Sequence, residues 1–291
     1  MMAFFVRLAD DYGPAISCFQ KSFFRNIIAL AIAAAVLLLP GGGRRRGVAA
    51  TGGIVCLLVA RSVFGTAGIF ANFKAISEIP IAEAMTLNKT APFFTVLFSW
   101  IFLREKVSRL QIVALLAAFA GAVLVMKPCF GGDAAAPRAT ALFGGLSAGA
   151  AYVCVHQLGR LGYSGAKTVL FFSAFSCLAS LPPAVSTYVP MTAAQVWILV
   201  GAGASAAVGQ FGVTAAYRYA EPRKIAVFDY SNVVFAALLG FAFFGQMPDF
   251  LSVAGFILIF AAATASAAVR TGIPRAASDV EGDRSALKNK R

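Results

Sequence analysis

Long apolar runs, separated by short polar or charged turns, occupy most of the chain from residue 22 to residue 270. A run of about 20 apolar residues is long enough to cross the hydrocarbon core of a bilayer as a helix. The runs, bounded by turn and charge signals, predict an all-α integral membrane protein with nine full transmembrane helices. These spans lie near residues 22–39, 57–76, 81–103, 108–127, 139–159, 166–186, 195–217, 224–245 and 250–270.

One pattern of polar and apolar positions occurs twice, first over residues 75–105 and again 141 residues later over 216–246. Each copy has a polar turn, an apolar helix interrupted by Asn88 or Asp229, a polar corner and a further apolar span. Two such halves are typical of a transporter whose site lies between them. We therefore expect a first repeat at 1–127, a linker at 128–138, a second repeat at 139–270 and a disordered cytoplasmic tail at 271–291.

Composition supports a membrane protein. Hydrophobic residues make up 59% of the chain and the mean hydropathy is +0.80, more than a soluble domain needs for its core. The net charge of +13 could indicate a nucleic-acid partner. However, Lys and Arg stand at the ends of apolar runs, where membrane proteins collect them. We expect the lipid bilayer, and no nucleic acid, as a partner.

The distribution of positive charge predicts the orientation. If the loop around Gly41–Arg46 is cytoplasmic, most of the 25 Lys and Arg residues, Arg61 included, fall on the cytoplasmic side, and so does the C-terminus. Nine spans then leave the N-terminus outside. Residues 1–9 are too short to span and lack a signal-peptide pattern. We expect them to be the stub of a truncated first helix.

Several short motifs stand in and around the apolar runs: Phe23-Phe-Arg25-Asn26, Arg61-Ser-Val-Phe-Gly65, Pro80-x-Ala82-x-Ala84, Leu87-Asn-Lys-Thr-Ala-Pro92-Phe-Phe94, Glu105, Gly121, Phe228-Asp-Tyr230 and Phe244-Gly-Gln246. In their order and spacing they resemble the EamA-type family of the drug/metabolite transporter superfamily over roughly residues 4–268. The resemblance implies two inverted five-helix repeats around a central substrate path. The incomplete first helix departs from it. Val233 stands where the first repeat has Pro92, which predicts a softer helix break in the second repeat.

Lys89 and Asp229 are the sharpest candidates for a site. Each lies within an apolar run, where an ionisable group costs on the order of 2.5–3.5 kcal/mol by insertion scales. The family fold implies that both helices line the central path. A cation and an anion facing one cavity suit a zwitterion, with Lys89 for its carboxylate and Asp229 for its ammonium group. The alternative is an ion pair that only holds the halves together, and a pair that breaks during transport would satisfy both.

Further polar residues fall inside or at the ends of the apolar runs. Those expected to line the substrate path are Asn88, Asn232, Asn72, Gln210 and Arg25. The amides could equally bridge helices, and the arginine could extend to the membrane interface. Glu83 follows Pro80 at the start of a span, where a carboxylate caps a helix N-terminus. Glu83 and Asp229 are also the candidates for proton coupling.

Other polar residues favour structural roles. We expect Glu105 to neutralise its basic neighbours and cap the next helix, and no residue beside His156 in the sequence supplies it with a partner. Gly145-x-x-x-Gly149 predicts close helix packing within the chain. The five cysteines show no spacing of metal ligands, so neither a metal nor a cofactor is expected.

These observations favour a secondary transporter that moves an amino acid or a related amphipathic solute across the inner membrane by alternating access. No nucleotide-binding motif is present, so ATP does not drive it directly. The single histidine and the absence of hydrolase motifs argue against an intramembrane enzyme. A membrane scaffold and an inactive truncated transporter stay as alternatives. Both a monomer and a homodimer are compatible with the sequence.

Overall fold

The computed structural model describes residues 5, 9, 12–14, 16–39, 48–79, 81–126, 134–244 and 249–268. Throughout these residues the regular structure is helical, without strands, so the all-α prediction is confirmed for this part of the chain. The helices are α2 (Cys18–Leu38), α3 (Gly52–Glu78), α4 (Ile81–Asn88), α5 (Ala91–Leu103), α6 (Arg109–Met126), α7 (Ala135–Arg160), α8 (Gly165–Ser186), α9 (Ala193–Tyr219), α10 (Pro222–Ile225), the 3-10 helix η1 (Phe228–Tyr230), α11 (Ser231–Phe244) and α12 (Phe250–Ala268).

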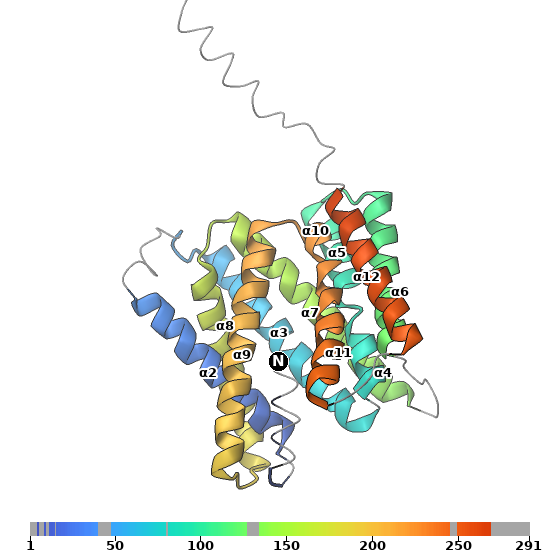
Figure 1. Ribbon diagram of the computed structural model, residues 1–291. Coiled ribbons are helices and arrows are strands. Elements are labelled where there is room, and N and C mark those ends of the chain that lie inside the picture. Colours follow the sequence, from blue (N-terminus) through green and yellow to red (C-terminus); the bar gives the residue numbers. More distant parts are fainter. Residues whose placement is uncertain are drawn as a thin grey trace, which may run out of the picture.

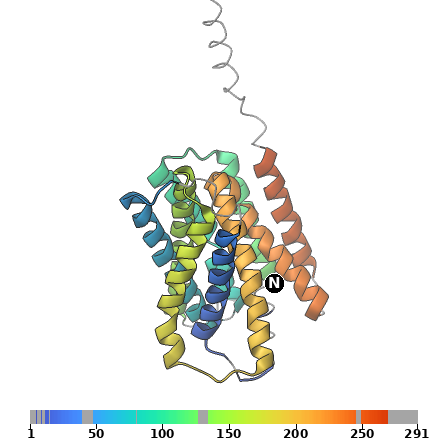
Figure 2. The same cartoon turned by 90° about the vertical axis from the view of Figure 1, so that its left-hand side faces the viewer.

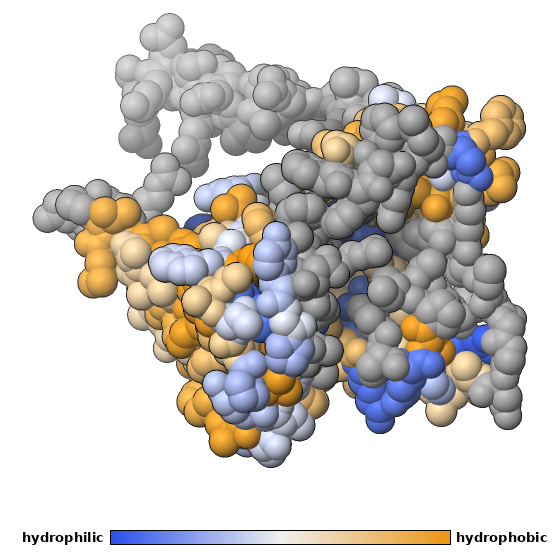
Figure 3. Space-filling view, turned by 60° about the horizontal axis from the view of Figure 1, so that its bottom comes forward, coloured by the Kyte–Doolittle hydropathy of each residue, from blue (hydrophilic) through white to orange (hydrophobic). Residues whose placement is uncertain are grey.

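The longest helices have the length and composition of membrane spans. Among the described residues, five helices are long and apolar enough to cross a bilayer, within α2, α3, α7, α8 and α9. Two shorter apolar helices lie at Arg109–Val125 and Phe250–Ala265. Large apolar side chains such as Trp197 and Ile257 are exposed on the outside, and apolar residues are prominent on the outer flank in Figure 3. The protein is therefore a multi-pass membrane protein.

The helices form two groups that flank α7 (Figure 1). In one group α2 packs against α8 and α9, and Figure 2 shows it in front of these two helices. In the other group α6 packs along α12. Helix α7 contacts α3, α5 and α9, so it connects the two groups through the middle of the molecule.

Two of the expected spans are interrupted. The span at 81–103 divides into α4 and α5, with Lys89 and Thr90 in the turn between them. Pro92 lies in the first turn of α5, where a residue without a backbone N–H is tolerated. The backbone N–H groups of the next two residues, Phe93 and Phe94, both donate to the Thr90 carbonyl, at 2.9 and 3.3 Å. These bonds start α5 independently of α4.

The span at 224–245 is also interrupted, although Ala226, Val227 and Ser231 keep right-handed helical backbone angles. It divides into α10, a turn, η1 and α11, and α10 has only four residues. Val233 is a buried core residue rather than a helix breaker. The break is instead made by a 3-10 turn, in which the Tyr230 N–H donates to the Val227 carbonyl at 3.3 Å.

The interruption between α4 and α5 packs against a face of α7 that is formed by glycines. A Cβ atom at Gly145 would lie 2.6 Å from Thr90 Oγ1, and one at Gly149 would lie 2.7 Å from Phe94 Cβ. The Gly145-x-x-x-Gly149 motif therefore serves packing within one chain. It lets the interrupted helix approach the backbone of α7 closely, which larger residues would prevent.

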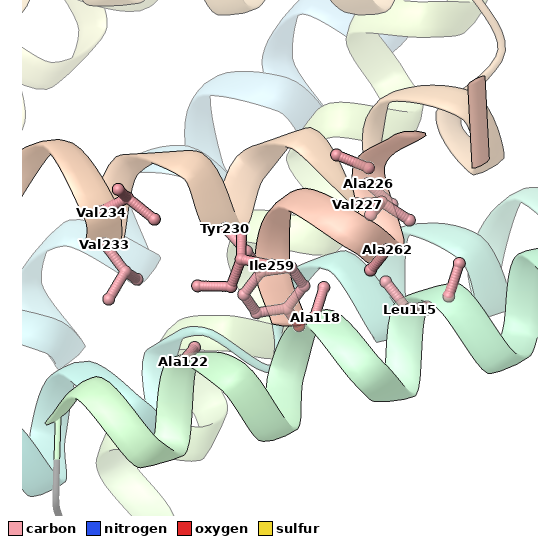
Figure 4. Close-up of a cluster of buried hydrophobic side chains, with 12 residues drawn as sticks. Leu115, Ala118, Ala122, Ala226, Val227, Tyr230, Val233, Val234, Ile259 and Ala262 are labelled. Atoms are coloured by element: carbon pink, nitrogen blue, oxygen red, sulfur yellow. The ribbon is translucent and has the colours of Figure 1, made fainter. Parts of the chain in front are cut away.

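A cluster of buried apolar residues holds the second break in place (Figure 4). Side chains of α6, α12 and the segment from Ala226 to Val234 meet there, with Tyr230 and Ile259 fully buried. Close contact between Gly121 of α6 and Gly255 of α12 brings these two helices together, because a Cβ on either would lie within 2.7 Å of the other's carbonyl oxygen. The polar turn around Asp229 is thus anchored on an apolar base.

The expected stub of a first helix falls mostly outside the described residues, as do the tail at 271–291 and all of the linker but residues 134–138. Of the N-terminal residues that are described, Ala9 is buried against Leu199 of α9. The Gln195 side-chain amide donates to the carbonyl oxygens of Ala9 and Pro14, at 3.0 Å each. This segment is therefore tied to the start of α9.

The glycine face of α7 makes a prediction about stability. Gly149→Ala places a Cβ against Phe94 and the Thr95 backbone N–H, and such overpacking costs about 1–3 kcal/mol. We expect a lower midpoint of thermal unfolding in detergent micelles. Gly212→Ala on α9 is the matched control, since its Cβ would meet nothing within 4 Å. Equal unfolding midpoints for the two variants would contradict close packing at Gly149.

Candidate functional site

Two adjoining cavities lie where α2, α3, α7 and α9 meet the interrupted helices. The larger has a volume of about 540 Å³ and the smaller about 330 Å³. They share lining residues from both breaks and from α7, among them Asn88, Lys89, Tyr152 and Asn232. Small-molecule sites typically measure about 300–1,000 Å³, so the space suits a small organic solute.

The structure brings together residues that are far apart in the sequence. The candidates that line the larger cavity are Arg25, Asn72, Asn88, Lys89, Gln210 and Asn232. Asp229 lines the smaller cavity beside Lys89. The side chain of Glu83 lies outside the described part of the structure. Seven candidates from five parts of the chain therefore border two cavities that share lining residues.

The two helix breaks bind each other across the repeat distance. The Tyr230 hydroxyl donates to the Lys89 carbonyl at 2.8 Å. In return, Lys89 Nζ donates to the Asp229 carbonyl at 3.4 Å. The Lys89 carbonyl is free for this bond because Phe93, its partner in a continuous helix, donates to Thr90 instead. Backbone groups that an interrupted span exposes inside a bilayer need such partners.

The charged groups of Lys89 and Asp229 do not bind each other directly among the described contacts. The lysine ammonium group contacts a backbone oxygen. The Asp229 carboxylate accepts a hydrogen bond from the Tyr217 hydroxyl at 2.9 Å, and the Tyr217 ring stacks on Tyr152 at 4.7 Å between centroids. Both charges therefore stand at the cavity wall in their own hydrogen-bonding environments, rather than neutralising each other in a closed ion pair.

The side-chain amides of Gln210 and Asn72 differ in their hydrogen bonds. Gln210 Nε2 donates to Thr214 Oγ1 at 3.4 Å within α9. Asn72 Oδ1 is buried and has no hydrogen-bond partner among the described residues. Asn72 also lines the larger cavity, but its oxygen is shielded from solvent. A buried acceptor without a partner costs roughly 1–3 kcal/mol.

Arg61 is a lining residue that the sequence analysis missed. The charge count placed it on the cytoplasmic side, whereas the structure places it within α3, 3% exposed and at the wall of the larger cavity. Its guanidinium group lies 4.0 Å from the centre of the Phe172 ring of α8. The signal was its position inside an apolar run, in the motif that ends at Gly65.

A second polar cluster lies at the end of α5. Arg104, with φ of 55°, turns the chain in the left-handed region, and Glu105 then points back to the helices. Its carboxylate accepts from Ser99 Oγ at 2.5 Å and lies 3.0 Å from His156 Nε2. His156 therefore has a partner, although that partner is 51 residues away in the sequence.

The hydrogen bonds of this cluster indicate which ring nitrogen of His156 carries a hydrogen. Its Nδ1 lies 2.8 Å from the Tyr217 carbonyl, and a carbonyl only accepts, so Nδ1 carries a hydrogen. Contact between Nε2 and the Glu105 carboxylate then needs one further proton between the two groups.

Glu105 does not cap the next helix, α6, as expected. Ser108 does so, accepting from the Gln111 N–H at 3.2 Å while its own N–H donates to Gln111 Oε1 at 3.0 Å.

The approach to the second break is charged. Glu221 bonds to Arg223 Nε at 2.7 Å and to Lys224 Nζ at 3.1 Å, just before α10. Burial opposes ionisation of Glu221, but the hydrogen bonds from Arg223 and Lys224 outweigh it and lower the pKa of the carboxyl below its ordinary value. These contacts fix the first turn of α10 at the edge of the protein.

The sequence matches known membrane transporters. The EamA-like transporter family matches residues 1–127. A pseudopaline exporter of Pseudomonas aeruginosa is 31% identical over 219 residues, which cover 75% of this chain and 77% of that protein. A riboflavin transporter of Rhizobium johnstonii is 30% identical over 215 residues, 72% of this chain and 68% of that one. The chain belongs to the EamA-like transporter family.

A solved crystal structure shares the fold, with a TM-score of 0.78 at 18% identity, over 94% of this chain and 96% of the other. The names of the relatives point to transport rather than to enzymatic catalysis. Among the described residues, no group of three or more His, Cys, Asp or Glu side chains could hold a metal ion. The class of protein is therefore a membrane transporter.

The bond between the two breaks can be tested with Tyr230→Phe. This change keeps the buried ring and leaves the Lys89 carbonyl without its donor, at a cost of about 1–3 kcal/mol. We expect a lower unfolding midpoint in micelles. Tyr219→Phe is the control, because Tyr219 is 71% exposed. If both variants unfold at the wild-type temperature, the hydroxyl does not stabilise the break.

The cluster at the end of α5 can be tested with Glu105→Ala and His156→Ala. Each change leaves a buried partner unsatisfied, so each should lower the free energy of unfolding by about 1–3 kcal/mol. The double variant should lose less than the sum of the two, because the residues are in contact. Glu221→Ala is the control, with a partly exposed carboxylate and a loss below about 1 kcal/mol. Simple additivity would contradict the contact.

Proposed function

We propose that the protein is a secondary transporter that moves an amino acid or a related amphipathic solute across the inner membrane by alternating access. The observation that carries the proposal is the position of Lys89 and Asp229. They stand on adjoining cavities at the point where two interrupted helices meet. Interrupted helices at the centre of a membrane protein are typical substrate sites of transporters.

The chemistry of the wall supports a zwitterionic solute. The Lys89 ammonium group can bind a carboxylate, and the Asp229 carboxylate can bind an ammonium group. Among the described contacts, the two charged groups do not form an ion pair with each other. The Tyr152 ring, which stacks on the buried Tyr217 ring, adds an apolar surface to the cavity that Asp229 lines. The Asn72 amide lines the larger cavity together with Lys89.

The position of one hydrogen bond supports alternating access. The contact between Lys89 Nζ and the Asp229 carbonyl, at 3.4 Å, is long for a hydrogen bond. A substrate carboxylate that binds Lys89 competes for this ammonium group and so weakens one link between the two interrupted helices. In the proposed cycle the two repeats, 1–127 and 139–270, then rock against each other around the site, with the C-terminus in the cytoplasm.

The relatives support transport of an organic solute without identifying which one. The pseudopaline exporter and the riboflavin transporter are named for different solutes, so the substrate of this chain has to be argued from its own cavity. The name of the first favours export. Asp229 and Glu83 are the groups proposed to couple transport to protons, and the protein is proposed to act as a monomer or a homodimer.

The proposal predicts the behaviour of two variants in proteoliposomes. Wild-type protein should take up labelled amino acids, while Lys89→Ala and Asp229→Asn should each reduce the initial rate by about tenfold or more, the loss of one charge-assisted bond. An imposed proton gradient should accelerate the wild type and leave Asp229→Asn unaffected. Uptake is measured with radiolabelled amino acids at equal protein content.

Lys74→Ala serves as the control, since it removes an exposed charge from α3 outside the cavities. Its rate should equal that of the wild type. Full transport by both cavity variants, in protein that elutes as a single folded species, would overturn the site. The two charges would then be structural.

A further inference from the structure

The larger cavity carries more positive charge than a simple zwitterion needs. Arg25 of α2, Arg61 of α3 and Lys89 all line it, whereas Asp229 of the smaller cavity is the one carboxylate among the described lining residues of both. Charged groups withdrawn from water inside a membrane protein are costly unless they are compensated. The described walls therefore favour a guest with net negative charge.

Arg61 is buried, and its guanidinium group is not fully hydrogen-bonded by the described part of the protein. It is 3% exposed, and its Nε has no hydrogen-bond partner among the described residues. Its most evident contact is with the face of the Phe172 ring, at 4.0 Å, which fixes the plane of the guanidinium group. A buried N–H donor without an acceptor is expensive, and the same side chain lines the cavity, where a ligand oxygen can approach it.

The helix makes room for this guanidinium group. A Cβ atom at Gly65, one helical turn after Arg61, would overlap Arg61 Nη1 and would lie 2.7 Å from Phe172. Glycine at this position therefore keeps the guanidinium group lying along α3 between its own helix and α8. The position is built for the arginine, and it holds the charged group at the cavity wall.

We propose that Arg61, with Arg25, forms an anion subsite that binds a second acidic group of the substrate. The preferred substrate is then an amino-acid-like solute with at least two acidic groups and one amine. Its amine meets Asp229, one carboxylate meets Lys89, and the further carboxylate meets the arginines. This inference rests on the proposed transport function and narrows its substrate class.

The chemistry of the subsite fits a carboxylate. Guanidinium groups present paired N–H donors that match the two oxygens of a carboxylate, and such charge-assisted pairs are about twice as strong as neutral hydrogen bonds. The cavity of about 540 Å³ has room for a solute with two separated acidic ends. Asn72, on the same wall, is polar and does not add charge.

The test compares acids with their neutral amides on the full chain. Purified protein in proteoliposomes is given L-glutamate against L-glutamine, and L-aspartate against L-asparagine, and uptake and competition are measured. Each pair differs by one carboxylate. We expect the wild type to prefer each acid by about tenfold or more, as one charge-assisted pair provides.

Variants assign this preference to the subsite. Arg61→Gln should reduce the preference to about twofold or less while amide uptake persists, and Arg61→Lys should keep part of it. Gly65→Ala should weaken it as well, because the guanidinium group has to move; this variant carries the test if Arg61→Gln does not fold. Lys74→Gln removes an exposed charge from the same helix and should leave the preference unchanged.

The outcomes separate this inference from the proposed function. Equal handling of acids and amides by the wild type, or an acid preference that survives in folded Arg61→Gln, overturns the anion subsite and leaves zwitterion transport standing. Failure of the wild type to bind or move any of the four solutes overturns amino-acid transport and the subsite with it. Preference for acids that Arg61 variants abolish supports both.

Discussion

The reciprocal bonding of two helix breaks is the constraint on which the rest of this structure depends. A helix that stops inside a membrane leaves backbone groups without partners, and here each break supplies a side chain to the other's carbonyl. Tyr230 can do so because the apolar cluster of α6 and α12 buries its ring. The first break can come close enough because Gly145 and Gly149 leave space along α7.

The same residues that stabilise the centre also present its chemistry. Lys89 contributes its carbonyl to the fold and its ammonium group to the cavity. Asp229 contributes its carbonyl to Lys89, while its carboxylate is oriented by Tyr217. In the proposed function, a solute that binds the Lys89 ammonium group competes with one contact between the two interrupted helices, and one that binds the Asp229 carboxylate competes with its bond to Tyr217. The same two residues therefore stabilise the helix breaks and line the cavities, so the proposed binding of a solute would be coupled to the protein's conformation.

The features that the sequence predicts are those encoded within one continuous run of residues. Long apolar runs were enough to predict an all-helical membrane protein, and ionisable residues inside two of those runs singled out Lys89 and Asp229 before any geometry was known. The family assignment was predictable too, because it rests on motifs in a fixed order. The repeat boundaries, the count of nine spans and the use of the cavity by a substrate stay predictions.

The sequence could not predict contacts between distant segments. The presence of Val233 in place of proline does not reveal that a 3-10 turn interrupts the second span, or that Tyr230 bonds to the first break. Arg61 was counted with the cytoplasmic charges, since burial against Phe172 depends on how α3 and α8 pack. The partner of His156 was missed for the same reason. Glu105 comes from another helix end and meets it only in the folded chain.

That contact gives the protein a built-in reporter. The chain has one histidine, so selective isotope labelling of histidine yields a single imidazole signal without assignment by mutagenesis. The ring touches the Glu105 carboxylate and the Tyr217 backbone, and the Tyr217 hydroxyl bonds to Asp229 at the smaller cavity. One resonance therefore reads out the corner of α5, the end of α7 and the last turns of α9 together. Its chemical shift follows their rearrangement in a working membrane, with no foreign probe attached to the protein.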